Sequence, residues 1–186
     1  MGTLRVISGS AKGLRLKTVP GDTTRPITDL VKESLFNILG DTIEDATILD
    51  LFGGTGAVGI EALSRGAEFV TFIDNSYRAV KIIKENLTTT DLSDYAEVFK
   101  RDAFDFLRSN PERQYDIIYV APPQYKKMWL IALEIIDTKP DLLTKDGTII
   151  VQINPLEWEI VTLQSLTESH QRKYGDTSLF FFIRSQ

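Results

Sequence analysis

The fold is decided by residues 48–59, which read Ile-Leu-Asp-Leu-Phe-Gly-Gly-Thr-Gly-Ala-Val-Gly. The first five form a mostly apolar run of the length of a buried strand, and Ala57 to Arg65 reads as a helix closed by Gly66. Crowded glycines between a strand and a helix let the backbone turn tightly and approach a ligand, while the helix amino terminus offers free N–H groups. This stretch predicts a strand, a ligand-binding loop and a helix.

Strands and helices alternate after this loop. We expect strands at 69–73, 96–99, 117–120 and 148–151, and helices from Ser76 to about Leu87, from Ala103 to Arg108 and from Met128 to Ile136. Such alternation is typical of a doubly wound α/β fold, in which helices cover both faces of a mostly parallel sheet. Segments 170–174 and 177–183 flank Gly175-Asp176 and predict a final antiparallel hairpin. We expect Trp129 to lie in the core, Phe180–Phe182 to pack in the sheet and His170 to be an ordinary strand residue.

The amino-terminal segment differs from the rest in pattern and charge. Residues 4–7 and 14–17 alternate like short strands around a turn-like stretch, which predicts a hairpin extension over residues 1–24 and a main domain over residues 25–186. Arg25-Pro26 is expected to open the first helix of the main domain, with Gly40 as its stop.

Length and composition indicate an ordinary globular chain. The 186 residues carry a net charge of −5, yet residues 1–20 hold four basic and no acidic side chains, so the remainder sums to −9. An acidic body with a basic arm suggests an anionic partner at one end, although such charges also suit a solubilising edge strand. No apolar run approaches the ~18 residues of a membrane span, so we expect a soluble cytoplasmic protein without a membrane partner.

The chain has no cysteine and one histidine, His170. The absence of cysteine excludes disulfides, thiolate zinc sites, iron–sulfur clusters and a cysteine nucleophile. Because only one histidine is present as well, we expect no metal site.

Two cofactors compete for the glycine loop. Gly54, Gly56 and Gly59 satisfy the dinucleotide pattern G-x-G-x-x-G, and Asp74, at the end of the next strand, suits a ribose hydroxyl pair in either NAD or S-adenosylmethionine. Asp50, just before the loop, is a poor neighbour for a pyrophosphate but favours a cationic sulfonium or amino group. Asp50 therefore favours adenosylmethionine, whereas Asp74 suits either cofactor.

Two further loops are expected at the same edge of the sheet. Asp102 follows the third strand and could accept a hydrogen bond from an adenine amine, or it could cap the short helix that follows. Pro122-Pro123 follows the fourth strand. The two prolines lock the backbone there, so that the Pro122 carbonyl could face a bound group, or they could merely end the strand.

Taken together, these segments resemble the RsmD family of ribosomal RNA methyltransferases, which methylate the exocyclic N2 of a guanine in 16S rRNA. The resemblance runs nearly end to end, and its carriers are Arg5-Val6-Ile7-Ser8-Gly9, Lys12-Gly13, Arg25-Pro26-Ile27-Thr28-Asp29, Lys32-Glu33, Leu35-Phe36-Asn37, the run 49–66 and Tyr174-Gly175-Asp176-Thr177.

The resemblance implies a Rossmann-like, seven-stranded, adenosylmethionine-dependent methyltransferase fold with an amino-terminal hairpin that helps to grip RNA. It implies that the cofactor is held by Asp50, Phe52, Gly53, Gly54, Thr55, Gly56, Asp74, Asn75, Asp102 and Ala103. RNA phosphates would be contacted by Arg5, Lys12, Arg15 and Arg25, and the target base would enter the Pro-Pro loop. The expected partner is small-subunit ribosomal RNA or the assembling subunit, and the expected state is a monomer.

Two positions of the Pro-Pro loop depart from the family pattern. Such amino-methyltransferases usually read Asp or Asn, then Pro-Pro, then an aromatic residue, whereas this chain has Ala121 and Gln124 at these positions. Losing one acceptor for the target amine is comparable with removing an oxyanion-hole donor, ~10²–10³ in rate. Pro122, Gln124 and Tyr125 are therefore the catalytic candidates. Gln124 would replace the missing acceptor, and Tyr125 would stack on the base or instead pack against the helix of Trp129.

Three alternatives to this enzyme stay open at this point. The chain could bind cofactor and RNA but have lost catalysis through Ala121, it could methylate another RNA or DNA base, or it could be a nicotinamide oxidoreductase. The last leaves Asp50, the Pro-Pro loop and the basic hairpin unexplained.

Overall fold

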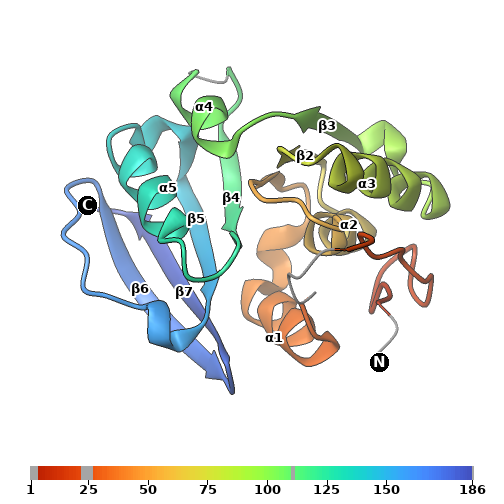
Figure 1. Ribbon diagram of the computed structural model, residues 1–186, viewed down its shortest axis with the longest axis horizontal. Helices are drawn as coiled ribbons and strands as arrows, with labels where there is room; N and C mark the ends of the chain where they lie inside the picture. Colours follow the sequence, from red (N-terminus) through yellow and green to blue (C-terminus); the bar gives the residue numbers. More distant parts are fainter. Residues whose placement is uncertain (1–3, 22–26, 110–111, 186) are drawn as a thin grey trace.

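The computed structural model describes residues 4–21, 27–109 and 112–185 (Figure 1). Its centre is one seven-stranded sheet in the order β3-β2-β1-β4-β5-β7-β6. β1 to β5 run parallel, and β7 lies antiparallel between β5 and β6. The strands are β1 Thr47–Asp50, β2 Phe69–Asp74, β3 Ala96–Lys100, β4 Tyr115–Val120, β5 Leu143–Ile153, β6 Leu166–Tyr174 and β7 Thr177–Arg184. The mostly parallel sheet and the final hairpin predicted from the sequence are confirmed.

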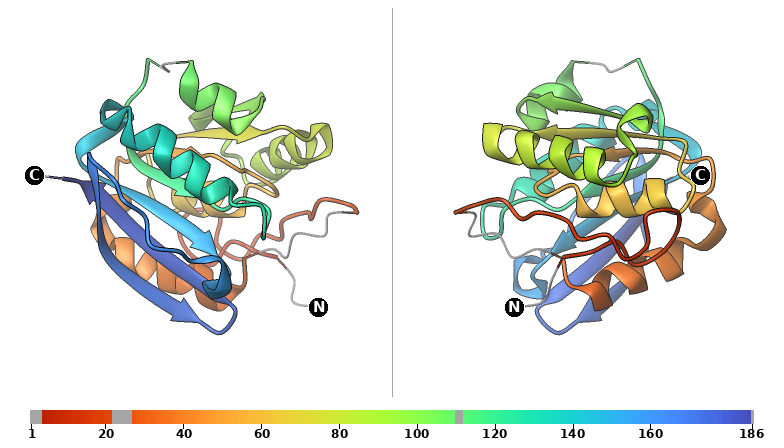
Figure 2. Two further views of the ribbon diagram at one scale, coloured as in Figure 1. Left: turned by 60° about the vertical axis from the view of Figure 1, so that its left-hand side comes forward. Right: turned by 90° about the vertical axis from the view of Figure 1, so that its right-hand side faces the viewer.

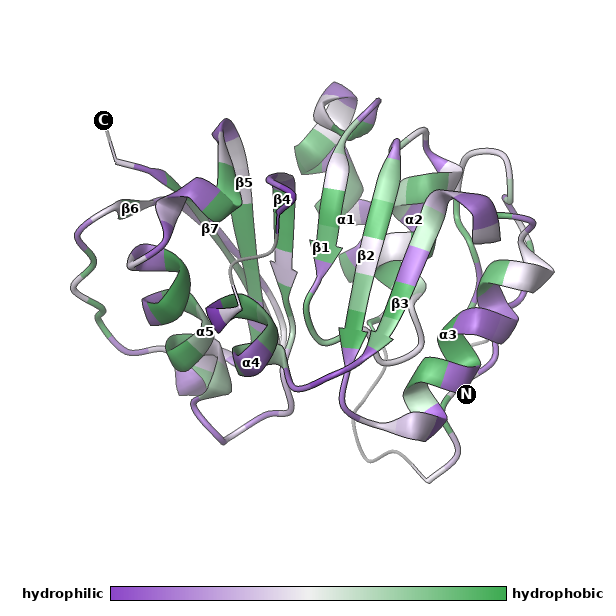
Figure 3. Cartoon of the chain, turned by 90° about the horizontal axis from the view of Figure 1, so that it is seen from above, coloured by the Kyte–Doolittle hydropathy of each residue, from purple (hydrophilic) through white to green (hydrophobic). Residues whose placement is uncertain are grey.

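Helices cover both faces of this sheet. They are α1 Asp29–Leu39, α2 Ala57–Ser64, α3 Tyr77–Thr89, α4 Ala103–Arg108 and α5 Met128–Asp137, with short 3₁₀ turns at Gly40–Ile43, Ser93–Tyr95, Pro140–Leu142 and Pro155–Glu157. Apolar side chains of α1, α2 and α3 form one core with the sheet, and those of α4 and α5 form the other. Figure 3 shows the central strands between these helices, coloured as hydrophobic along much of their length. The fold is doubly wound.

The helix boundaries follow local capping chemistry. The side chains of Ser76 and Asp102 accept hydrogen bonds from the first-turn N–H groups of α3 and α4, so both helices begin where the sequence predicts. The expectation that α1 opens at Arg25-Pro26 is wrong, because the Thr28 hydroxyl accepts from the Val31 N–H and the helix begins at Asp29. Gly40, with φ of 51°, ends α1 as predicted.

The order of the parallel strands reverses at β1. β1 pairs with β2 on one side and with β4 on the other, so the chain winds outward in opposite directions from the β1/β4 boundary. In such sheets the loops that leave the carboxyl ends of neighbouring strands diverge at this boundary and leave room for a ligand. The loops after β1, β2, β3 and β4 all lie at that edge.

The amino-terminal segment, residues 4–21, is called the arm here. It crosses the outer side of α2 between α1 and α3 (Figure 2). The arm is a hairpin with a single antiparallel bridge, Arg5 to Arg15, and buries Leu4, Val6 and Leu16 against the helices. Its ladder is short because several of its backbone N–H groups donate to side chains of the main domain. The predicted boundary between residues 24 and 25 lies outside the described residues.

A buried carboxylate anchors the arm. Glu61 of α2 is fully buried and accepts from the backbone N–H groups of Ile7 and Ser8, at 2.8 and 3.0 Å. It also pairs with the buried ammonium of Lys32, at 3.2 Å, and with the Arg65 guanidinium, at 2.8 Å. Every hydrogen-bonding direction of this carboxylate is occupied, so its desolvation is compensated.

The three structural assignments made from the sequence hold. Trp129 is fully buried, and its ring stacks on Trp158 with centroids 5.3 Å apart. Phe180, Phe181 and Phe182 are buried in the sheet, and His170 of β6 stacks on Phe181 at 4.2 Å. The Trp158 ring also stacks on Phe180, with centroids 3.9 Å apart, so these aromatic side chains connect the carboxyl-terminal hairpin with α5.

We expect Glu61→Ala to lower the free energy of unfolding by about 3–5 kcal/mol, because it leaves the Lys32 charge buried without its partner. The control is Asp29→Ala, which breaks the exposed Arg5–Asp29 pair and should cost at most ~1 kcal/mol. Urea unfolding measures both, and equal losses in the two variants would contradict this account of the arm.

Candidate functional site

The glycine loop turns sharply between β1 and α2. Gly54 and Gly56 have φ of +56° and +78°, a backbone region that side-chain-bearing residues rarely adopt. Gly53 and Gly59 are required for packing instead. A Cβ atom at Gly53 would lie 2.7 Å from Ile83 Cδ1, and one at Gly59 would lie 2.4 Å from the Phe72 ring. The number of glycines thus reflects both the shape of the loop and the close approach of α2 to the sheet.

Asp74 holds the loop from the end of β2. One carboxylate oxygen accepts from the Gly54 N–H at 2.9 Å, and the other accepts from the Ser76 N–H at 2.8 Å. The carboxylate is therefore fixed at the carboxyl edge of the sheet, directly beside the turn of the loop. Asn75, the next residue, is exposed.

Asp50 lies beneath the loop at the end of β1 and is 2% exposed. Burial raises its pKa from 3.8 to about 8; the Gly59 N–H opposes this shift, and the nearby Asp74 carboxylate adds to it. Its Oδ1 atom is buried and has no hydrogen-bond partner within the described part of the chain. Such an atom normally has a partner, so Asp50 fits a site completed by a polar or cationic ligand.

The loop after β3 brings a third acid to this edge. The Asp102 carboxylate accepts from the N–H groups of Phe104 and Asp105, so its helix-capping role is confirmed. Ala103 is buried, and the Phe104 ring lies edge-on to that of Phe52, with centroids 6.2 Å apart. An apolar wall thus connects the glycine loop with the loop after β3.

The Pro-Pro loop follows β4 at the same edge. Pro122 is buried, Ala121 is half-buried, and Gln124 is exposed. Tyr125 is 67% exposed, so the alternative in which it packs against the helix of Trp129 is wrong. Its backbone has φ of 61°, and its N–H donates to Glu157 Oε2 at 2.7 Å. Glu157 therefore holds the loop in a conformation that costs energy for a residue with a side chain.

The predicted RNA contacts differ in their surroundings. Arg5 pairs with Asp29 at 3.1 Å. Lys12 and Arg15 are exposed, and neither forms an ion pair with another residue that the structure describes. Arg25 lies outside the described residues. Of the basic side chains of the arm, Lys12 and Arg15 are thus the two without an ion pair among the described residues.

Three residues that organise the site were not assigned a role from the sequence. Glu61 and Asn86 bind the arm, and Glu157 binds the Pro-Pro loop. Their partners lie 32 to 69 positions away along the chain, so no local pattern reveals them. A polar residue on the buried face of a helix, as at positions 61 and 86, is the one signal that could have drawn attention to two of them.

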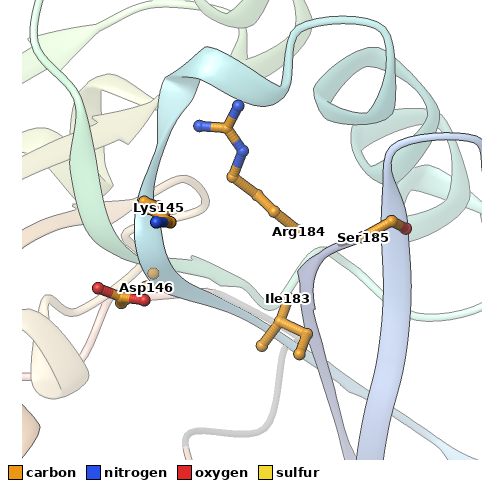
Figure 4. Close-up of a pocket in the computed structure, with 6 residues that line it drawn as sticks. Lys145, Asp146, Ile183, Arg184 and Ser185 are labelled. Atoms are coloured by element: carbon orange, nitrogen blue, oxygen red, sulfur yellow. The ribbon is translucent and has the colours of Figure 1, made fainter.

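A hollow at the opposite edge of the sheet is unrelated to these loops. It has a volume of about 590 Å³ and is lined by residues 145–147 and 183–185, where β5 begins and β7 ends (Figure 4). Within the described ranges no group of three or more His, Cys, Asp or Glu residues could hold a metal ion. In the same ranges no helix has both the length and the apolar character to cross a membrane.

The strand order, the antiparallel β7 and the glycine loop at the reversal point define the class of protein: this is a Rossmann-like α/β chain with the methyltransferase fold. Residues 4–183 match the family described as Conserved hypothetical protein 95, and the chain belongs to that family. The resemblance to the RsmD family is confirmed by the relatives described next.

The chain is 40% identical over 182 residues to "Putative rRNA methyltransferase YlbH" of Bacillus subtilis, covering 96% of this chain and 98% of that protein. It is 38% identical over 125 residues to "Ribosomal RNA small subunit methyltransferase D" of Haemophilus influenzae, covering 66% and 64%. A solved structure, "Putative methyltransferase yhhF from Escherichia coli", superposes with a TM-score of 0.85 at 28% identity and 98% coverage of both chains.

We expect Asp50→Asn to stabilise the protein increasingly as pH rises. With a folded-state pKa of about 8 against 3.8, the folded protein keeps a proton that the unfolded chain releases, so stability falls as pH rises between these values. The asparagine cannot ionise and avoids this loss. In thermal unfolding between pH 5 and about pH 9, the difference in Tm between Asp50→Asn and the wild type should widen, at roughly 2–4 °C per kcal/mol of difference in stability. Exposed Asp94→Asn is the control. A difference in Tm that stays constant with pH would contradict the raised pKa of Asp50.

Proposed function

We propose that this chain transfers the methyl group of S-adenosylmethionine to the exocyclic N2 amine of a guanine in small-subunit ribosomal RNA. It would act in the cytoplasm, as a monomer, on the RNA or on the assembling subunit. One observation carries the proposal: the family match spans nearly the whole chain, arm included. The fold supports it, because the glycine loop, Asp50, Asp74, Asp102 and the Pro-Pro loop all lie at the carboxyl edge of the parallel strands.

The residues at this edge fit the cofactor. Asp50, with its unpartnered buried oxygen, would face a polar or cationic part of the methionine moiety. Asp74 and Asn75 would hold the ribose, because a carboxylate oxygen can accept from more than one donor. Asp102 and Ala103 would meet the adenine, and Phe52 would line the apolar wall beside it. Gly53, Gly54, Thr55 and Gly56 would let the backbone approach closely.

The Pro-Pro loop would prepare the target amine. The nitrogen lone pair of guanine N2 is delocalised into the ring, so the amine is a weak nucleophile until acceptors hold its two N–H bonds. The Pro122 carbonyl would accept one N–H and the Gln124 amide oxygen the other, while the Tyr125 ring stacks on the extruded base. Bound adenosylmethionine supplies an electrophilic methyl carbon on a positively charged sulfur.

Positioning supplies most of the rate. The Pro-Pro loop would hold N2 against the bound methyl group in a near-attack geometry of ~3–3.5 Å, so that transfer to the nitrogen needs little further movement. The nitrogen proton becomes acidic after transfer and leaves to water, so this chain needs no general base.

The direct test uses the purified chain, tritiated adenosylmethionine and small subunits that lack the modification. Label recovered as N2-methylguanosine in small-subunit RNA supports the proposal. Label on another base, or cofactor binding with no transfer to RNA or DNA, would overturn it.

Gln124→Ala should lower kcat by about 10²-fold, because the amine then loses its second acceptor. Adding Ala121→Asp to that variant should restore much of the rate, since the carboxylate supplies an acceptor at the position the family uses. Exposed Gln171→Ala on β6 is the matched control. If Gln124→Ala leaves kcat unchanged, Gln124 has no such role.

Lys12→Ala and Arg15→Ala should each weaken RNA binding and reduce the slope of log K against log salt concentration by about one unit. Exposed Lys145→Ala, at the opposite edge of the sheet, should leave the slope unchanged. Filter binding at several salt concentrations measures all three. Unchanged slopes in both arm variants would remove the arm from the RNA interface.

Ala121 favours a second candidate, a protein that binds cofactor and RNA without catalysis. Ala121→Asp in the otherwise unchanged chain separates the two. A wild type without activity that gains it through this substitution supports the binding protein, whereas an active wild type supports the enzyme.

A further inference from the structure

Asn86 of α3 lies fully buried between the arm and the glycine loop. Its Oδ1 atom accepts from the Lys17 N–H at 2.8 Å, and its amide nitrogen donates to the Lys17 carbonyl at 3.0 Å and to the Thr55 carbonyl at 2.9 Å. Both amide hydrogens and the amide oxygen are therefore used. One side chain bonds to two backbone segments that are far apart in the sequence.

The contact with Thr55 falls between Gly54 and Gly56, the two glycines of the loop that have positive φ. The Thr55 carbonyl belongs to the peptide unit that enters Gly56, whose φ is +78°. Ile83, one turn earlier on α3, packs against the same loop, within 3.3 Å of a Cβ atom placed on Gly56. Ile83 thus limits the space around the loop, and the Asn86 amide fixes the direction of one peptide plane within it.

Packing alone does not explain the choice of asparagine at this position. Asparagine is a weak helix former, and burying an amide costs free energy unless all its groups are bonded. An apolar residue would fill this position without that cost if packing were the sole requirement. The amide matches one donor and two acceptors that belong to the arm and the loop, so the position serves their mutual placement.

The other anchors of the arm act at a distance from the loop. The Ser64 hydroxyl accepts from the Ala11 N–H at 2.9 Å and donates to the Ser8 carbonyl at 2.6 Å, and Glu61 binds Ile7 and Ser8. Neither side chain bonds to residues 53–56 within the described structure. These anchors therefore provide a comparison in which arm attachment is weakened and the loop is left alone.

We propose that Asn86 is a positioning residue for cofactor binding and that, through it, the arm backbone at Lys17 forms part of the support of the cofactor loop. The inference rests on the proposed function, because it takes the glycine loop as the adenosylmethionine site. It adds a second role for the arm besides contact with RNA: cofactor affinity depends on the connection that the Asn86 amide makes between Lys17 and Thr55, even when no RNA is present.

The test is calorimetric titration of the full chain with S-adenosylhomocysteine, without RNA. Asn86→Asp keeps an acceptor for the Lys17 N–H but loses both donations, and its carboxylate faces two carbonyl oxygens. We expect the dissociation constant to rise about 10-fold, as for the loss of a buried hydrogen bond. In methylation assays the KM for adenosylmethionine should rise while kcat at saturation changes little.

Three control variants separate positioning from general damage. Ser64→Ala weakens arm attachment, and Lys17→Ala removes the Lys17–Glu85 ion pair but keeps the backbone. Thr90→Val, at the carboxyl-terminal cap of α3, removes a buried hydroxyl that donates to the Asn86 backbone carbonyl but leaves the Asn86 side chain unchanged. Each should bind S-adenosylhomocysteine within about 2-fold of wild type, whatever its unfolding free energy. If Asn86→Asp does not fold, Asn86→Ser, which is neutral and too short to reach Thr55, replaces it in the same titration.

The outcomes are distinct. A wild type that does not bind S-adenosylhomocysteine refutes the proposed function itself. A wild type that binds, together with an Asn86 variant of equal affinity, refutes the positioning role and leaves the proposed function standing. Equal losses of affinity in the Asn86 variant and in Ser64→Ala or Thr90→Val also refute it, because the effect is then general destabilisation.

Discussion

The close approach of α2 to the sheet is the constraint on which the rest of the structure depends. At Gly59 the helix lies so near Phe72 of β2 that a Cβ atom would be 2.4 Å from the ring. This contact sets how closely α2 lies against the sheet, directly after the glycine loop that leads into it. The opposite side of the same helix presents Glu61 and Ser64 to the arm. One short helix thereby places the cofactor loop on the sheet and the arm on the outer surface.

Much of this architecture follows from local sequence. Strand positions were predictable because parallel strands buried on both faces are short apolar runs, and helix starts were predictable where Ser76 or Asp102 provides a cap. The start of α1 was misplaced because a proline in a favourable position outweighed the Thr28 cap that the helix uses. β5 begins at Leu143, well before the predicted Thr148. The sequence pattern missed this part of the strand because residues 144–147 are polar or glycine and interrupt the apolar run.

The site was predictable in part, and for a different reason. Asp50, Asp74, Asp102 and the Pro-Pro loop could be identified because each lies at or just after the end of a strand, and the carboxyl ends of parallel strands share one edge. The hydrogen bonds that hold these elements could not. Asn86 to Thr55 and Glu157 to Tyr125 join positions 31 and 32 residues apart, and each depends on how helices and loops pack in three dimensions. The sequence pattern therefore predicts the elements of the site better than it predicts their supports.

The outermost strand, β6, has a consequence for how copies of the chain meet. Its pairing with β7 shifts register between Glu168 and His170, and it carries charged side chains at Glu168, Arg172 and Lys173. An irregular, charged border opposes the addition of a foreign strand, whose backbone would need a straight and uncharged template. The sheet consequently ends at β6, and edge-to-edge aggregation through that border is disfavoured.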